Sequence, residues 1–294
     1  RELRAKLALH EGVPAEQILC GNGAADLIFR LVWAKKPRRA LVTAPTFAEY
    51  ATALESIGCM VKRFFLREQE DFAVTDAFCA AIRPGVDMVF LCQPNNPTGQ
   101  LTALPLVEQI LHRCAACGTL LVVDECFLDF LPDHALHTAK GLLGEGDLVI
   151  LKAFTKLYGM AGVRLGYALS ADTALLEQMQ ACGQPWGVSS LAQAAGLAAL
   201  EETAYVEKVR ALIAEQRPRL TAGLRALGLR VLDGRANYLL FQAPETLGET
   251  LRQRGAVLRS CANYPGLGPG WYRTAVRTGP ENEQLLKLLA EVLE

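Results

Sequence analysis

The sequence predicts an α/β fold: a large, mostly parallel sheet with helices on both faces, followed by a smaller α+β C-terminal domain. Short apolar runs rich in Val, Leu and Ile alternate with longer segments of helical periodicity. Most of these runs are apolar throughout, which is typical of strands buried on both faces of a parallel sheet. After about residue 187 the alternation gives way to Ala-, Leu- and Glu-rich helical sequence and then to shorter strands.

Six apolar runs have the length of a strand, and helical segments separate them. The strand candidates are Ala40–Ala44, Val61–Leu66, Asp87–Cys92, Thr119–Asp124, Leu148–Lys152 and Leu165–Ser170. The helix candidates include Ala24–Lys36, Phe47–Ile57, Leu104–Ala116 and Thr173–Cys182. This order favours a sheet with helices on both faces.

The last third of the chain has a different pattern. Residues 189–227 predict one or two long helices. The elements expected after them are strands Tyr238–Gln242, Val257–Arg259 and Tyr272–Val276, and helices Thr246–Arg254 and Glu281–Leu293. We expect residues 1–203 to form the large domain and residues 204–294 the small one.

Composition excludes several classes of protein. Hydrophobic residues make up 51% of the 294, which excludes intrinsic disorder. Thirty basic and 31 acidic residues give no basic surplus for binding nucleic acid. The uncharged run Ala181–Leu200 is too polar to span a membrane, and no signal peptide is visible. Nine cysteines, an odd number, are interpreted as reduced thiols in a cytoplasmic protein.

Turn-forming residues follow two of the predicted strands. In an open α/β sheet, ligands bind outside the carboxyl ends of the strands. Gly21-Asn22-Gly23 comes after Leu19–Cys20 and opens a helix, where free N–H groups and the helix dipole would bind a phosphate. The same motif is also an ordinary turn and helix cap. Gln93–Gly99, after another strand, is equally compatible with a tight turn.

A carboxylate and a lysine follow two later strands. Asp124 ends a run that should be buried, and a buried carboxylate needs a cationic or hydrogen-bonding partner. Lys156 follows Leu148–Lys152 and precedes the turn-like motif Gly162-Val163-Arg164-Leu165-Gly166. A lone lysine is usually solvated, but one at the carboxyl edge of a sheet beside a phosphate-type turn is less usual.

The order of these motifs resembles the fold-type I pyridoxal 5′-phosphate (PLP) enzymes. Gly-Asn-Gly, Pro-Asn-Asn-Pro-Thr-Gly, Asp-Glu, Thr-Lys and Gly-x-Arg-x-Gly follow one another between residues 21 and 166. Within that superfamily the chain is similar to histidinol-phosphate aminotransferases and to the L-threonine O-3-phosphate decarboxylases of cobalamin biosynthesis. The stretches that resemble the decarboxylases in particular are Phe47–Tyr50, Leu66–Glu68, Gly234–Leu240 and Arg259–Leu267.

The resemblance implies a PLP site. By it, Lys156 binds the cofactor covalently, and Asp124 pairs with the protonated pyridine nitrogen, so that the ring acts as an electron sink. Asn96 hydrogen-bonds the 3-oxygen of the ring and also lies beside the substrate. Phe47 stacks on the face of the ring.

The resemblance also implies contacts to the cofactor phosphate. The N–H groups of Gly23 and Ala24, the Thr155 hydroxyl and the Arg164 guanidinium would hold it. Phe127 stands beside the ring, where the aminotransferases carry a tyrosine that also binds the 3-oxygen. A phenylalanine here is expected of the decarboxylases.

Two arginines of the small domain complete the implied site. Arg273 matches the residue that binds the substrate carboxylate, and Arg259 matches one that binds the substrate phosphate. Without the resemblance, each would be interpreted as a surface ion pair. The implied partners are a small phosphorylated amino acid and a second copy of the chain, as a homodimer, but no membrane and no nucleic acid.

Two differences from the family pattern stand out. Ala153 replaces a hydroxyl residue often found three positions before the lysine. Family members also carry several dozen residues before the point that matches Arg1, including a tyrosine that reaches the neighbouring subunit's cofactor.

Two short motifs with the spacing of metal ligands are given no such role. Cys114-x-x-Cys117 has no second pair, and His134-x-x-His137 has no third ligand, so no metal is expected.

Two alternatives to decarboxylation stay open. A histidinol-phosphate-type aminotransferase would share every cofactor residue except the missing tyrosine. A PLP-fold module that only binds a ligand usually lacks the lysine or the aspartate, whereas Lys156 and Asp124 are both present.

Overall fold

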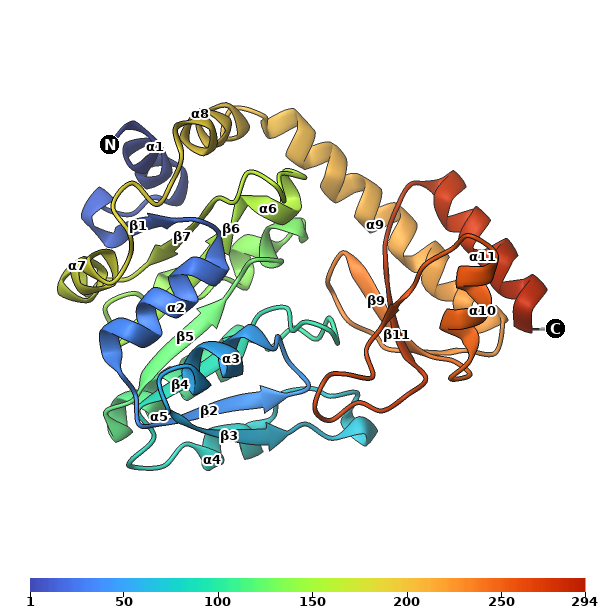
Figure 1. Ribbon diagram of the computed structural model, residues 1–294, viewed down its shortest axis with the longest axis horizontal. Coiled ribbons are helices and arrows are strands. Elements are labelled where there is room, and N and C mark those ends of the chain that lie inside the picture. The colour runs from blue at the N-terminus through green and yellow to red at the C-terminus, as the bar shows by residue number, and fades with distance from the viewer. Residues whose placement is uncertain (294) are drawn as a thin grey trace.

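A seven-stranded sheet forms the core of the larger part of the molecule (Figure 1). The computed structural model describes residues 1–293. Across the sheet the strands are β1 (Ile18–Gly21), β7 (Gly166–Leu169), β6 (Leu148–Ala153), β5 (Leu120–Asp124), β4 (Met88–Cys92), β2 (Arg39–Ala44) and β3 (Met60–Phe65). All neighbours are parallel except that β7 runs antiparallel to β1 and β6. The predicted mostly parallel sheet is confirmed.

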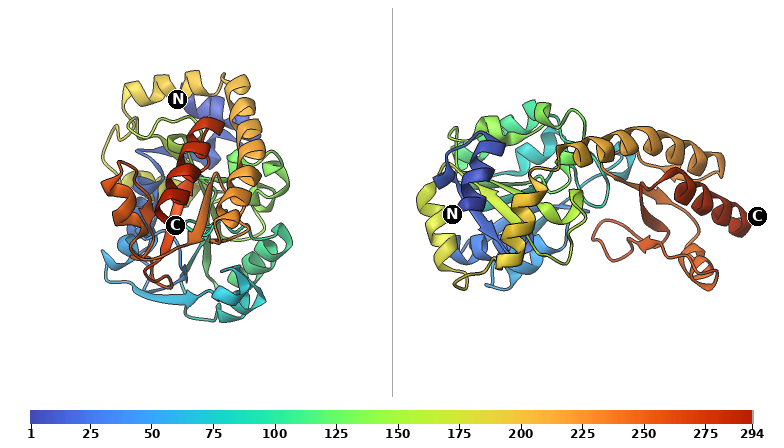
Figure 2. Two further views of the ribbon diagram at one scale, coloured as in Figure 1. Left: turned by 90° about the vertical axis from the view of Figure 1, so that its right-hand side faces the viewer. Right: turned by 90° about the horizontal axis from the view of Figure 1, so that it is seen from above.

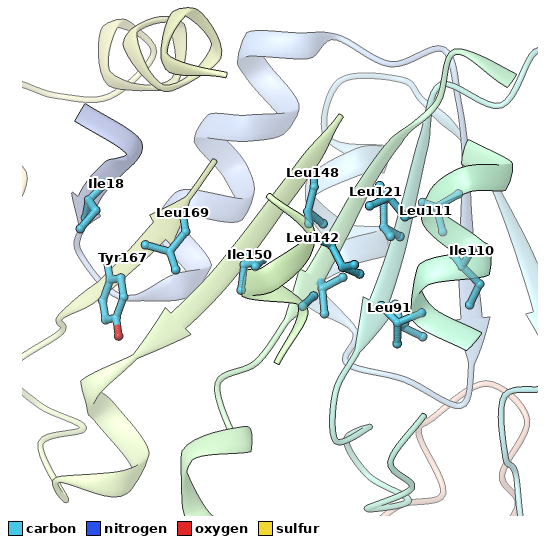
Figure 3. Close-up of a cluster of buried hydrophobic side chains, with 14 of the residues drawn as sticks. Ile18, Leu91, Ile110, Leu111, Leu121, Leu142, Leu148, Ile150, Tyr167 and Leu169 are labelled. Atoms are coloured by element: carbon cyan, nitrogen blue, oxygen red, sulfur yellow. The ribbon is translucent and has the colours of Figure 1, made fainter. Parts of the chain in front are cut away.

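Helices cover both faces of this sheet, as predicted. One face packs against α2 (Ala24–Lys35), α3 (Glu49–Glu55) and α7 (Thr173–Ala181). The other face packs against α1 (Glu2–Glu11), α4 (Asp76–Ala81), α5 (Leu104–Cys117) and α8 (Ser190–Ala199). Successive residues of a strand point to opposite faces, so Leu121 joins the cluster under α5 while Val122 joins the other (Figure 3).

The burial of the strands follows their place in the sheet. The inner strands β2, β4, β5, β6 and β7 are buried almost throughout, as the apolar runs predict. The edge strand β3 is the exception, since Met60 is 67% and Phe65 59% exposed. An edge strand has a neighbour on one side only, so its residues need not all be buried.

A second, four-stranded antiparallel sheet is built from the last part of the chain. Its order is β10 (Arg259–Ser260), β11 (Trp271–Ala275), β9 (Tyr238–Gln242) and β8 (Arg230–Val231). The helices beside it are α9 (Thr203–Ala226), α10 (Leu247–Gln253) and α11 (Gly279–Leu293). α9 extends from the large sheet to the small one (Figures 1 and 2). The division between residues 203 and 204, near the start of α9, stays a prediction.

Several short elements were not expected from the sequence. They are α1, α4, β8 and the one-turn helix α6 (Phe154–Leu157). Short 3₁₀ helices lie at Ala15–Gln17, Glu68–Glu70, Leu128–Phe130, His134–Leu136 and Ala139–Leu142. Within residues 1–293, no helix combines the length and the apolar character needed to cross a membrane.

Candidate active site

Five parallel strands bring the predicted site residues to one edge of the large sheet. Asp124, the last residue of β5, lies level with Cys92 of β4 and Leu151 of β6. The segments that carry Phe47, Asn96 and Lys156 leave the sheet at this carboxyl edge. This is where ligands bind in open α/β sheets.

The antiparallel strand β7 brings Arg164 to the same edge. Its first residue, Gly166, pairs with Gly21 at the end of β1 and with Ala153 at the end of β6. The loop that enters β7 therefore begins at the carboxyl edge of its neighbours. Arg164, in this loop, adopts a left-handed backbone conformation with φ 59°.

The start of α2 forms a tight cradle. A Cβ on Gly166 would lie 2.6 Å from the backbone nitrogen of Ala24, and a Cβ on Gly23 would lie 2.7 Å from the guanidinium of Arg164. Gly23 also has φ 85°, and no side chain caps the helix. The residues come this close only because both positions are glycine. The result is a helix N-terminus beside a guanidinium, a suitable place for a phosphate.

Asp124 is buried, and both of its carboxylate oxygens accept hydrogen bonds. The Tyr50 hydroxyl donates to Oδ2 at 2.6 Å, and the backbone N–H of Cys126 donates to Oδ1 at 3.0 Å. The Tyr50 ring stacks on Phe90 at 4.7 Å and meets Phe47 edge-on at 5.5 Å. The predicted ring partner and the predicted stacking residue thus share one neighbour, Tyr50.

Asn96 connects the large sheet to the small one. Its side-chain oxygen accepts a hydrogen bond from the Arg273 guanidinium and a longer one, 3.4 Å, from the Tyr264 hydroxyl. Arg273 lies over the ring of Tyr238, 4.9 Å from its centroid. The guanidinium of Arg259 lies 5.5 Å from the ring centroid of Tyr264. The two predicted substrate arginines therefore lie on neighbouring strands of the small sheet, and Arg273 contacts Asn96 directly.

A cavity of about 450 Å³ joins Lys156 to these arginines. Phe127, Lys156, Arg259 and Arg273 all line it. The Lys156 amine lies 5.7 Å from the centroid of Phe127, within the range of a cation–π contact. Thr155, another predicted cofactor contact, is buried beside Lys156 at the start of α6. It forms no hydrogen bond with the other predicted cofactor residues.

Four residues before Lys156 in the sequence, Lys152 lies at the centre of a buried cluster of charges. Lys152 of β6 lies 2.8 Å from Asp129, 3.7 Å from Glu11 and 3.8 Å from Glu125. Burial alone would lower the pKa of Lys152, but the three carboxylates hold it above its ordinary value. Since Glu125 follows Asp124 directly, the cluster joins the two segments that carry Asp124 and Lys156.

The acids of this cluster differ in their pKa. Burial raises the pKa of Glu125 to about 7, although Lys152 opposes the change. For Glu11, burial also acts to raise the pKa, but Lys152, the Tyr167 hydroxyl and Lys140 outweigh it and lower the value to about 2. Glu125 is therefore the member that titrates near neutral pH.

The two motifs set aside as metal ligands have other contacts. His134 forms hydrogen bonds with the carbonyl oxygen of Leu131 and with the guanidinium of Arg210. His137 forms one with the carboxylate of Asp133. Cys114 is buried on α5.

Comparisons with known proteins place this geometry in a family. The profile of "Aminotransferase class I and II" matches residues 1–292. The chain belongs to this family. A threonine-phosphate decarboxylase of Salmonella typhimurium is 40% identical over 99% of this chain and 81% of its own length. A histidinol-phosphate aminotransferase of Symbiobacterium thermophilum is 35% identical over 100% of this chain and 81% of its own.

A solved structure shares the fold. The histidinol-phosphate aminotransferase from Sinorhizobium meliloti, in complex with pyridoxal-5′-phosphate, superposes with a TM-score of 0.87 at 24% identity, over 99% of this chain and 81% of that one. The aminotransferase class I and II enzymes use PLP as their cofactor. The residues of this chain fit that group, because the glycine cradle, the buried Asp124 and the Lys156 amine lie at one edge of the sheet.

Two site residues were not identified from the sequence. Tyr50 and Tyr264 both lie in stretches that resemble the decarboxylases, but the resemblance implies no role for either residue. A tyrosine in an amphipathic helix is usually interpreted as part of the core. For Tyr50, the signal that the sequence offers is a spacing of three residues from Phe47.

Proposed function

We propose that the protein is a PLP-dependent decarboxylase that converts L-threonine O-3-phosphate to (R)-1-amino-2-propanol O-2-phosphate, a step of cobalamin biosynthesis. One observation carries the proposal. Arg259 of β10 is the direct partner of Arg273 of β11, and both line the cavity that contains Lys156. Two guanidiniums side by side suit a substrate with two anionic groups.

The two arginines divide the anions between them. Arg273 binds the substrate carboxylate, since it is half-buried, lies on Tyr238 and is held by Asn96. Arg259 is exposed at the rim of the cavity and binds the phosphate, which extends farther from the reacting carbon. A planar guanidinium matches either group with two parallel hydrogen bonds.

Residues of the large sheet hold the cofactor. We assign Lys156 to the covalent bond with PLP, Asp124 to the pyridine nitrogen, Asn96 to the 3-oxygen and Phe47 to the ring face, with Phe127 alongside. When bound, PLP supplies an electron sink for the bond that breaks at the α-carbon. Asp124 keeps a proton on the pyridine nitrogen, and Asn96 links the cofactor to Arg273.

The cofactor phosphate belongs in the cradle at the start of α2. The N–H groups of Gly23 and Ala24 and the Arg164 guanidinium surround that place. Thr155, at the start of α6, adds a hydroxyl. This anchor fixes the cofactor at the end opposite the substrate arginines.

Two observations favour decarboxylation over amino transfer. Phe127 stands where the aminotransferases carry a tyrosine, and the relative that is 40% identical is named a threonine-phosphate decarboxylase.

Amino transfer from histidinol phosphate is the second candidate. It is supported by the aminotransferase relative at 35% identity and by the cofactor residues that both activities share. A module that only binds a ligand is disfavoured by the presence of Lys156 and Asp124 together.

A side-by-side assay of two substrates tests the proposal. PLP-loaded protein receives either L-threonine O-3-phosphate alone or histidinol phosphate with 2-oxoglutarate. We expect CO₂ and the amino alcohol phosphate from the first mixture and no glutamate from the second. Glutamate from the second mixture, with no CO₂ from the first, would select the aminotransferase. Activity in neither, with tight binding of PLP, would select the ligand-binding module.

We also propose that the active form is a homodimer, which is typical of this family. The solution mass of the PLP-loaded protein should be twice that of the chain. A monomeric mass at full activity would contradict this.

A further inference from the structure

Tyr50 is a fully buried tyrosine that contacts two of the residues assigned to the cofactor. Its hydroxyl donates a 2.6 Å hydrogen bond to Oδ2 of Asp124. Its ring meets the ring of Phe47 edge-on at 5.5 Å and 82°. The side chain has no exposed surface, so it acts on a ligand only through these neighbours.

The position of Tyr50 is fixed from three sides. Phe47 lies two residues before α3 and Tyr50 lies in the first turn of that helix, and the short segment between them brings the two rings together. The Tyr50 ring is stacked on Phe90 of β4 at 4.7 Å, with the ring planes 14° apart. The ring is thus clamped between the sheet and Phe47, and its hydroxyl points at Asp124.

The Tyr50 hydroxyl supplies one of the two hydrogen bonds that hold the Asp124 carboxylate. The other oxygen of Asp124 accepts the backbone N–H of Cys126 at 3.0 Å. One donor on each oxygen fixes the plane of the carboxylate as well as its position. Without the Tyr50 hydroxyl, only one of the two carboxylate oxygens would keep its donor, the N–H of Cys126.

Tyr50 keeps its proton under all ordinary conditions. Burial, and then the nearby charge of Asp124, raise the pKa of the Tyr50 hydroxyl well above its ordinary value. The group is therefore a permanent donor to Asp124 and takes no part in proton transfer itself.

We propose that Tyr50 is a positioning residue that aligns Asp124 and Phe47 with the PLP ring. Its hydroxyl fixes the orientation of the Asp124 carboxylate, and its ring fixes the position of the Phe47 ring. This inference rests on the assignment of Asp124 and Phe47 to the cofactor, and not on the choice of substrate. It predicts that loss of the hydroxyl weakens cofactor binding and slows turnover, while the substrate pocket, built by the small sheet, is unchanged.

Tyr50→Phe tests the inference, because it removes only the hydroxyl. Tyr167→Phe is the matched control, since Tyr167 is also buried and also donates to a buried carboxylate, Glu11, outside the assigned contacts. The readouts are the dissociation constant of PLP from titration of the apo-protein, the Tm of the apo-protein, and kcat and KM of the loaded enzyme.

For Tyr50→Phe we expect the PLP dissociation constant to rise and kcat to fall, each about 10- to 100-fold, with KM changed less than about twofold. The control should show a similar change in Tm with an unchanged PLP dissociation constant. Equal PLP affinity in Tyr50→Phe and wild type, or an equal loss in both variants, would overturn the inference.

A double variant provides a second, independent measurement. If Tyr50 acts through Asp124, adding Tyr50→Phe to Asp124→Asn should weaken PLP binding by no more than about twofold beyond Asp124→Asn alone. Additive losses would overturn the inference. A wild-type protein that transfers amino groups instead of releasing CO₂ would refute the proposed function and leave these PLP measurements valid.

Discussion

The Arg273 guanidinium donates a hydrogen bond to the side-chain oxygen of Asn96. Arg273 belongs to β11 of the small sheet, whereas Asn96 follows β4 of the large sheet. One contact therefore joins the residue assigned to the substrate carboxylate to a residue assigned to the cofactor ring. The orientation of the substrate relative to the cofactor depends on how the two sheets meet at this point.

Replacing the two substrate arginines one at a time should show which of them affects substrate binding alone and which also affects turnover. Loss of a charge-assisted contact costs about 1.5–3 kcal/mol, or roughly a 10- to 150-fold effect. Arg259→Ala should raise KM for the phosphorylated substrate by that factor and leave kcat nearly unchanged. Arg273→Ala should lower kcat as well, because this residue also orients the bond that breaks. Steady-state kinetics measures both.

The matched control is Arg252→Ala, which changes an exposed arginine of α10 that pairs with Glu249. Its kinetic constants should equal those of the wild type. If Arg259→Ala behaves like Arg252→Ala, then Arg259 does not bind the phosphate.

Two glycines that flank Arg164, Gly162 and Gly166, should differ in their response to substitution by alanine. In Gly166→Ala the new methyl would lie 2.6 Å from the nitrogen of Ala24 and 2.9 Å from the carbonyl oxygen of Lys152. Overpacking of this kind costs about 1–3 kcal/mol. It should also displace the start of α2 and weaken PLP binding more than about tenfold. Titration of the apo-protein with PLP and thermal unfolding measure the two effects.

Gly162→Ala is the control within the same motif, because a methyl there has no heavy atom within 4 Å. It should bind PLP as the wild type does. Equal PLP affinity in both variants would show that the cradle at α2 is not the phosphate site.

Lys156 should carry the cofactor. Borohydride reduction of the PLP-loaded protein, followed by proteolysis and mass spectrometry, should find the label on the peptide that contains Lys156. Lys152, although only four residues away, is buried among three carboxylates that hold it protonated, so it should stay unlabelled. A label on any other lysine would refute the assignment.

Glu125 should make the protein less stable as the pH rises toward neutrality. Its pKa is about 7 in the folded protein, against an ordinary value of 4.5. Between these values the folded state retains a proton that the unfolded state has released, so the free energy of unfolding falls with rising pH. The fall amounts to roughly 3 kcal/mol if Glu125 titrates alone.

Glu125→Gln should abolish that dependence, since an amide does not titrate. Urea unfolding of both proteins at about pH 5 and about pH 8 measures it. The same fall in both proteins would mean that Glu125 is not its source.

Much of the site could be predicted because strand ends are visible in the sequence. The run that ends at Asp124 is apolar throughout, and the turn residues around Asn96 follow a similar run. Parallel strands end at one edge, so residues far apart in the chain, such as Gly23 and Lys156, are expected together. The order of the motifs then pointed to the PLP enzymes.

The direction of β7 and the contact of Tyr50 with Asp124 could not be predicted, for a physical reason. An apolar run has the same composition whichever way the strand runs, and only the observed pairing of Gly166 with Gly21 shows the antiparallel direction that places Arg164. The hydroxyl of Tyr50 finds its partner 74 residues away, at Asp124. A contact of that kind exists only once the sheet is assembled.

The fate of the substrate carboxyl carbon tests the central claim most directly. The PLP-loaded protein is given L-threonine O-3-phosphate labelled with ¹³C at that carbon, with and without 2-oxoglutarate, and the products are followed by NMR. The proposed function predicts that the label appears as CO₂ and bicarbonate at the same rate in both mixtures, with unlabelled (R)-1-amino-2-propanol O-2-phosphate as the other product. Label retained in a keto acid that forms only when 2-oxoglutarate is present would contradict it.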